Sequence, residues 1–259
     1  MPLSSAEIED LRTAKFLLET PGLAAKISNF VGSPIEKGFA LLPRKWRALV
    51  NDATRKSIEA ALDVALWTMD HNRAHAPSNR WHKLAVGTTG AAGGVFGLPA
   101  LAIELPLSTA IMLRSIADIA RSQGENLKSA AARLECVQVL ALGGRSNSDD
   151  GSETGYFAAR AAMATAVSDA VQHLARNGLS QHGAPAIVRL IALIASRFSI
   201  VVSEKAAAQA VPVVGAFGGA VINTLFIDHF QDMGKGHFIV RRLERAHGPE
   251  EVERIYNAL

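Results

Sequence analysis

Two long runs of this 259-residue chain carry no charged side chain, and they constrain the fold more than any other feature. Residues 84–103 and 206–227 span twenty and twenty-two positions, and each run is long enough to cross a bilayer as a helix. The first run holds seven large apolar residues, five glycines and a proline. Glycine costs about 1 kcal/mol relative to alanine inside a helix. We therefore expect this run to be helical only where another backbone packs closely against it.

Glycines in both runs are spaced four residues apart, which places them on one face of a helix and allows close helix contact. The pairs are Gly90 with Gly94, Gly93 with Gly97, and Gly215 with Gly219. Two interpretations follow: a glycine hairpin embedded in a membrane, or a central pair of buried helices in a soluble bundle. We favour the bundle, because both runs are rich in alanine and interrupted by proline. The two runs are then predicted to be helical and to contact each other or form one continuous buried layer.

Helical periodicity extends over the rest of the chain, with no alternating strand pattern. The helix signals are a capping box at Ser4 and Glu7, an amphipathic stretch over 44–70, Pro106 and Gly124 around one helix, Asn177 and Gly178 after another, and Gly248 and Pro249 before the last. We predict an all-α, single-domain multi-helix bundle over residues 1–259, in which two glycine- and alanine-rich apolar helices are central and residues 1–49 form an N-terminal helical layer.

Composition excludes several classes of protein. A hydrophobic content of 49% excludes intrinsic disorder. Cys136 is the single cysteine, so no intramolecular disulfide or cysteine-rich zinc site is available. The 27 basic side chains exceed the 24 acidic ones too slightly to indicate a nucleic-acid partner. The start of the chain is acidic and lacks the basic and apolar regions of a secretory signal, so we expect a cytoplasmic protein.

Two sequence motifs resemble those of the EcsC protein family. The first, GAAGGVFGLPALAIELP, covers residues 90–106, and the second, VPVVGAFGGAVIN, covers residues 211–223. His237-Phe238 ahead of Arg241 and Arg242 is similar to the closing basic helix of that family. The resemblance extends over about residues 50–248. Its motif residues are Gly90, Gly93, Gly94, Gly97, Pro99, Glu104, Pro106, Pro212, Gly215, Gly219 and Asn223.

The resemblance implies a family named after a product encoded beside a bacterial ABC transporter, with no established biochemical activity. It therefore names no reaction, substrate or cofactor. One departure from the family pattern is Glu104, where an aspartate is expected in most members.

Glu104 is the strongest candidate for chemistry, because it ends the first charge-free run. One interpretation is a buried carboxylate with a perturbed pKa that serves as an acid, a base or an ion ligand. The other is an acid at a helix N-terminus, facing free backbone N–H groups and a basic partner such as Arg197 or Lys205. We favour the second, because Pro106 is a residue typical of a helix start.

Two loose clusters contain histidine. His71 and His75 lie four apart but lack the glutamate of the zinc-protease motif. The second cluster comprises Asp228, His229, Asp232 and His237. An ion site there competes with a plain charged end to an apolar helix, and we favour the helix end. We predict no metal and no cofactor.

Other catalytic patterns are weak. The glycine run is not followed by the Gly-Lys-Ser/Thr of a nucleotide loop. Ser108, Ser115 and Ser203 lack the context of a nucleophile elbow, and Cys136 has no histidine near it in the sequence. No catalytic residue is assigned.

The last basic stretch places Arg241, Arg242 and Arg245 close to Phe238, a pattern that suits either an anionic membrane surface or a solvated outer face. We predict a non-catalytic, membrane-associated accessory or interaction protein, peripheral at the inner face of the membrane. Its expected partner is an anionic membrane surface or a membrane protein, with no nucleic acid. The alternative is a soluble hydrolase that uses Glu104 or the cluster of Asp228, His229 and Asp232.

Overall fold

The computed structural model describes most of the chain, and every regular element in the described part is a helix. The described residues are 2–19, 22–31, 36–68, 98–143, 155–177, 184–210 and 215–259. The helices are α1 (Ser5–Glu19), α2 (Leu23–Val31), α3 (Glu36–Leu41), α4 (Trp46–Thr68), α6 (Leu98–Ser122), α7 (Ala130–Leu142), α8 (Gly155–Asn177), α9 (Pro185–Gln209), α10 (Gly215–His247) and α11 (Pro249–Ala258). The predicted all-α bundle is confirmed.

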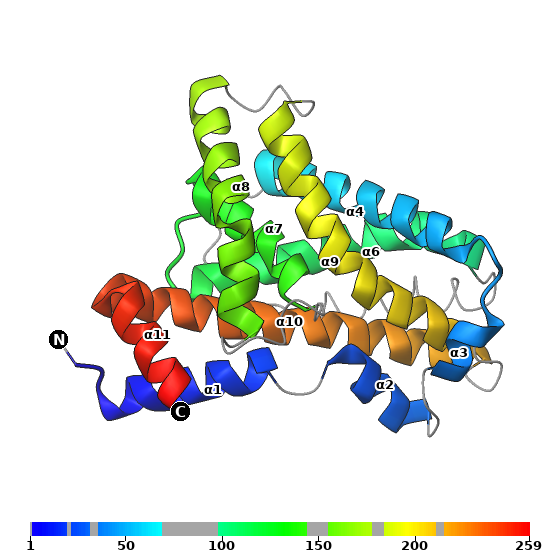
Figure 1. Cartoon of the computed structure of the whole chain (residues 1–259), viewed down its shortest axis with the longest axis horizontal. Coiled ribbons are helices and arrows are strands. Elements are labelled where there is room, and N and C mark those ends of the chain that lie inside the picture. The colour runs from blue at the N-terminus through cyan, green and yellow to red at the C-terminus, as the bar shows by residue number, and fades with distance from the viewer. Residues whose placement is uncertain are drawn as a thin grey trace.

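Helix α10 has 33 residues and runs along the length of the bundle (Figure 1). Helices α1 and α2 lie along one side of it, while α6, α7 and α9 pack against other parts of its surface. Helix α4 packs mainly against α6 and α9, and α8 against α7 and α9. Helix α11 folds back at the end of α10. The N-terminal helices therefore cover α9 and α10 directly.

The buried apolar residues form two clusters. The larger cluster joins α2, α4, α6, α7, α8, α9 and α10. It includes the rings of Phe198, Phe226 and Phe230, which pack in edge-to-face and tilted geometry with centroids 5.2–5.9 Å apart. The smaller cluster lies where α1, α8, α10 and α11 meet, around Tyr156 and Tyr256. Both bury aliphatic and aromatic surface, whose removal from water is the main stabilising contribution to such a bundle.

Several local predictions are confirmed. The Ser4 backbone N–H donates to Glu7 Oε2 over 2.8 Å, and the Glu7 N–H donates to Ser4 Oγ over 3.3 Å, which is a reciprocal capping box. Gly124 follows α6 with a φ of +80°, a backbone conformation that favours glycine. Pro249 begins the terminal helix as expected.

Two local predictions are wrong. Pro106 lies inside α6 and not at a helix start, because the helix already begins at Leu98 and has Pro99 in its first turn, where a proline is well tolerated. The run 206–227 is not one helix: α9 ends at Gln209 and α10 begins at Gly215. Most of the other run, residues 84–97, lies outside the described residues, so its predicted contact stays a prediction.

Candidate functional site

Three helices bring Glu104, Lys205 and Asn223 together in the interior. The Lys205 ammonium donates to Glu104 Oε1 over 2.6 Å and to Asn223 Oδ1 over 2.8 Å. Its third face lies over the Phe226 ring, with Nζ 4.6 Å from the ring centroid. The exposed fraction of Lys205 is 0%, and that of Glu104 is 6%. This lysine therefore links α6, α9 and α10 at a single buried point.

The local sequence explains why these polar groups point inward. Glu104 lies between the buried Leu101 and Leu105 on the core face of α6, while Ile103 points outward. On α9, Lys205 is followed by three buried alanines, 206–208. Such small side chains let neighbouring helices approach closely enough for a lysine to reach two partners.

The chemistry open to Glu104 is limited by this arrangement. A buried charge is tolerated when a counter-charge and hydrogen bonds compensate for its lost hydration. Here Lys205 supplies the counter-charge and Asn223 accepts a further ammonium hydrogen bond. Because Oε1 is paired and only 5% of the side chain is exposed, little of the Glu104 carboxylate is open to a substrate.

The expectation of a basic partner for Glu104 is confirmed for Lys205. Arg197, the other candidate, instead donates from Nε to the Ala141 carbonyl oxygen over 2.9 Å. The expectation that Glu104 faces a helix N-terminus is wrong, because α6 starts six residues earlier at Leu98. Glu104 is held by a side chain from another helix and not by free backbone N–H groups.

The remaining motif residues are only partly described. Gly90, Gly93, Gly94, Gly97 and Pro212 lie outside the described residues. Pro99 and Pro106 belong to α6. Gly215 and Gly219 belong to α10, eight and four residues before Asn223, so Gly219 lies about one helical turn from Asn223. Both motifs of the sequence therefore supply one polar partner to the same lysine.

The second candidate cluster is dispersed. Asp232 pairs with Lys26 over 2.8 Å, and His229 Nε2 donates to the Gly143 carbonyl oxygen over 3.1 Å. His237, although on the same helix, turns towards α7 and α8. In the described part of the chain no three His, Cys, Asp or Glu side chains are arranged to hold a metal ion. His71 and His75 lie outside the described residues.

Burial of His229 predicts acid sensitivity. Burial lowers its pKa from 6.5 to about 4, partly opposed by the bond to Gly143. Between these two pH values the His229 side chain binds a proton more readily in the unfolded chain than in the folded one. The contribution of neutral His229 to the free energy of unfolding is therefore fully present above pH 6.5 and is lost as the pH falls towards 4. We expect the free energy of unfolding to fall by about 3 kcal/mol across this pH range because of His229.

Urea unfolding at neutral and acidic pH measures this loss. His229→Gln keeps a donor for Gly143 but cannot titrate, so its stability should depend less on pH than that of the wild type. Equal pH dependence of the two proteins would contradict the assignment to His229.

A buried network around His237 was not predicted. Tyr156 OH lies 3.0 Å from His237 Nδ1, and His237 Nε2 lies 3.1 Å from Glu135 Oε2. Burial lowers the pKa of His237, against the opposing effect of Glu135. Burial acts to raise the pKa of Glu135, but His237 and Arg241 outweigh it and hold that pKa below its usual value. Both ring nitrogens of this fully buried histidine are occupied, so no substrate atom can reach them.

The three arginines proposed for a membrane surface are engaged within the protein. Arg241 pairs with Glu125 over 2.8 Å and with Glu135 over 3.0 Å. Arg242 pairs with Asp10 over 2.5 Å, and Arg245 pairs with Glu125. Nothing in the sequence marks these acids as partners, because they lie more than a hundred residues away. These ion pairs offset the charge of the three arginines, although the Arg242 and Arg245 side chains stay 38% and 40% exposed, and their contact with a membrane stays a prediction.

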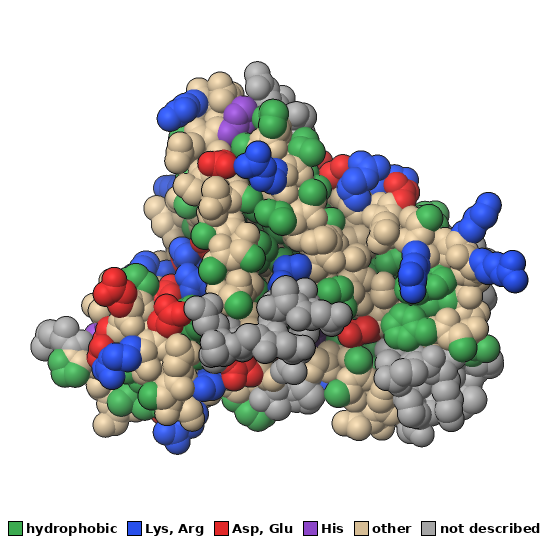
Figure 2. Space-filling view, in the orientation of Figure 1, with side chains coloured by type: hydrophobic (Ala, Val, Ile, Leu, Met, Phe, Trp, Pro, Cys, Tyr) green, Lys and Arg blue, Asp and Glu red, His purple; other side chains and the backbone are tan. Residues whose placement is uncertain are grey.

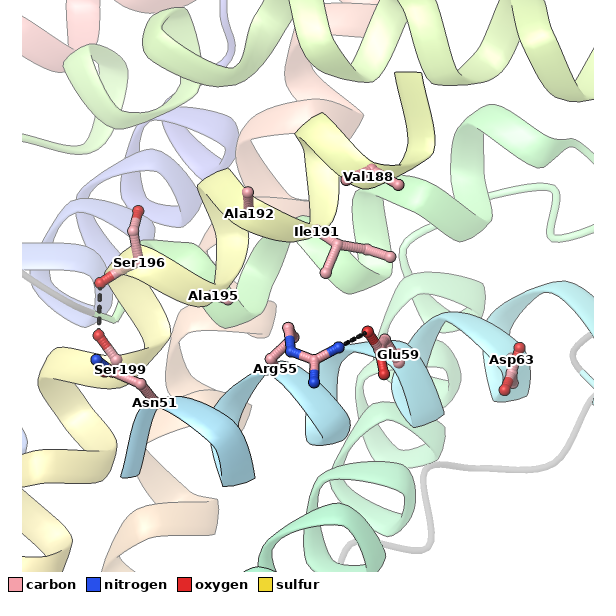
Figure 3. A pocket seen from close by; sticks show the side chains of 10 residues that line it. All are labelled: Asn51, Arg55, Glu59, Asp63, Val188, Ile191, Ala192, Ala195, Ser196 and Ser199. Atoms are coloured by element: carbon pink, nitrogen blue, oxygen red, sulfur yellow. Dashed lines mark hydrogen bonds and ion pairs between the residues drawn. The ribbon is translucent and has the colours of Figure 1, made fainter. Parts of the chain in front are cut away.

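A groove of about 930 Å³ runs between α4 and α9 (Figure 3). Its α9 wall is apolar, with Val188, Ile191 and Ala195, whereas the α4 wall carries charged side chains. Arg55 on that wall pairs with Glu59 over 2.8 Å. The Ser199 hydroxyl donates to the Ser196 carbonyl oxygen over 2.8 Å. The residues lining this groove include none of the predicted site residues.

The other nucleophile candidates have structural roles. The hydroxyls of Ser108 and Ser203 donate to the carbonyl oxygens of Leu105 and Ser199. Ser115 accepts a hydrogen bond from Gln231 Nε2 over 2.8 Å. Burial raises the pKa of the Cys136 thiol, which keeps it protonated and unreactive.

The fold and the site define a class: an all-helical bundle whose motif residues meet at a buried lysine. A family model described as the EcsC protein family matches residues 5–243, and the chain belongs to that family. The match begins well before residue 50, so it includes most of the N-terminal layer. Comparison with curated proteins and with solved structures found no match.

Proposed function

We propose that this EcsC family member is a non-catalytic accessory protein that associates peripherally with the inner face of a membrane. The observation that carries the proposal is the orientation of α6. Its motif acid Glu104 points inward into a closed ion pair, while Ile103 and Leu107 point outward with exposed fractions of 80% and 50%. Ile103 and Leu107 lie four residues apart on one face of α6, so together they offer a small exposed apolar surface to an apolar partner.

A hydrolase would need an accessible acid or base beside a substrate cavity. Glu104 is paired with Lys205 in the interior, and the cluster around Asp228 separates into contacts with different helices. The groove between α4 and α9 has the acids Glu59 and Asp63 on its wall but no histidine among its lining residues, and Glu59 is paired with Arg55. These contacts favour an accessory role over catalysis.

A peripheral association fits the helices better than a spanning one. Among the described residues, α9 is the helix long and apolar enough to cross a membrane, with a mean hydropathy of 1.9 over its most apolar window, 39% of which is buried. One helix that meets these criteria is weak evidence for a membrane span, because length and composition are the only properties tested. Moving α9 into a bilayer would also separate Lys205 from Glu104 and expose both charges to hydrocarbon.

Fractionation of cells that contain the untagged protein tests the proposal. At low ionic strength we expect the protein in the membrane pellet, and we expect high salt or carbonate to release it, because peripheral contacts are partly electrostatic and screened by salt. Recovery in the soluble fraction at low ionic strength would overturn membrane association. Resistance to both washes would overturn the peripheral mode and indicate a spanning segment.

A further inference from the structure

One end of the molecule carries an exposed basic corner where α3 meets α4, residues 41–47, sequence LLPRKWR. Arg44, Lys45 and Arg47 are all exposed, and Leu41 beside them has an exposed fraction of 54%. Figure 2 shows Lys and Arg side chains projecting beside hydrophobic surface at the end where Figure 1 places α3 and the start of α4. The corner therefore combines cations with apolar surface.

The positive charge of this corner is not neutralised within the described chain. None of Arg44, Lys45 and Arg47 forms an ion pair with a described acid, whereas the next basic residues, Arg55 and Lys56, both pair with acids on α4. The corner also lies at the N-terminus of α4, whose first turn has no acidic residue. The helix dipole adds partial positive charge at that point. Cations placed there repel the helix end, and an external anion relieves that repulsion.

Aromatic packing gives the corner a defined shape. The centroid of the half-buried Trp46 ring lies 5.8 Å from that of the Phe39 ring, and the ring planes make an angle of 46°. This contact joins α3 to α4. The Arg47 guanidinium lies 5.6 Å from the centroid of the Trp46 ring. Tryptophan with an apolar body and a polar N–H is enriched where protein meets the membrane–water interface.

We infer that the corner docks on the surface of an anionic phospholipid membrane. The inference rests on the proposed membrane association and assigns its contact residues. The three cations face headgroup phosphates, and Leu41 enters the boundary between headgroups and acyl chains. An exposed aliphatic side chain gains little from a nucleic acid, and the net charge of +3 offers no extended basic surface for one. A lipid surface is the partner that matches both the charge and the apolar residue.

Co-sedimentation of the full chain with vesicles tests this inference. We expect binding to vesicles that contain phosphatidylglycerol and no binding to pure phosphatidylcholine. Each basic residue near such a surface strengthens binding about fivefold, so R44Q/K45Q/R47Q should weaken it roughly a hundredfold. The matched control is K128Q/R176Q/K235Q, which removes the same charge from three exposed residues elsewhere that form no ion pair with a described acid. The control should retain most of the binding.

A second variant separates lipid from other anions. Leu41→Ser should weaken vesicle binding but leave binding to heparin unchanged, because only the membrane offers an apolar boundary. Equal loss in the corner and control triple variants would overturn the inference, as would absence of vesicle binding by the wild type. If fractionation still found that wild type in the membrane pellet, the proposed function would stand with a membrane protein as partner. Displacement from vesicles by an oligonucleotide that binds more tightly would indicate a nucleic-acid partner and overturn the inference too.

Discussion

Lys205→Met is expected to lower the free energy of unfolding by about 3–5 kcal/mol, the range typical of removing one partner from a buried ion pair. Methionine fills much of the lysine volume, so the lost free energy comes mainly from the missing charge and less from changed packing. The variant leaves the Glu104 carboxylate without its counter-charge and Asn223 Oδ1 without the ammonium donor. Urea unfolding at neutral pH measures the loss.

Glu104→Gln should also cost about 3 kcal/mol, because the Lys205 ammonium then stays buried without its counter-charge. From the sequence alone a smaller loss of about 1–2 kcal/mol is expected, since the amide still forms hydrogen bonds. The double variant E104Q/K205M should be more stable than the sum of the single losses predicts, by about 2 kcal/mol. Lys128→Met, at an exposed lysine, is the control and should change stability by less than about 0.5 kcal/mol. Additive losses would contradict a direct ion pair.

Gly38→Ala should destabilise the protein by about 3 kcal/mol, the upper end of the overpacking range. A Cβ at this position on α3 would lie 2.0 Å from the Ala207 carbonyl oxygen and 2.6 Å from its carbonyl carbon. These are backbone atoms of α9, so neither can rotate away, and α3 must separate from α9. Thermal unfolding measures the loss.

Gly234→Ala on α10 is the matched control, because a Cβ there would make ordinary contacts of 3.5–3.8 Å with Ile116 and Val139. Alanine has the higher helix propensity, so this variant should be neutral or more stable by up to about 1 kcal/mol. Similar losses in the two variants would show that the close approach of α3 to α9 has no special effect on stability.

Local signals in the sequence predicted much of the fold, and contacts over long distances explain what was missed. The capping box at Ser4 and the stop at Gly124 depend on neighbouring residues, and both are found where expected. Pro106 was misplaced because proline favours helix starts, yet α6 continues through it while packed against α4. Tertiary packing there outweighs a local preference.

The candidate site was predicted only in part, because the sequence shows which residues need a partner but not where a distant partner lies. A charge at the end of an apolar run needs a partner, which made Lys205 a reasonable candidate for Glu104. The position of that lysine on a helix one hundred residues later can be known only from the packing. The acids that engage Arg241 and Arg245 are equally distant. The basic corner is different, because three cations around Trp46 are visible in the sequence itself.

In the proposed function, the Glu104–Lys205 ion pair holds the helices together and residues on the protein surface contact the membrane. The most direct test is fractionation of cells that contain either the wild type or E104Q/K205M, after thermal unfolding has established that the double variant is folded. We predict that both proteins appear in the membrane pellet to the same extent and are released by the same salt concentration. A folded double variant found in the soluble fraction, with the wild type in the pellet, would contradict the claim.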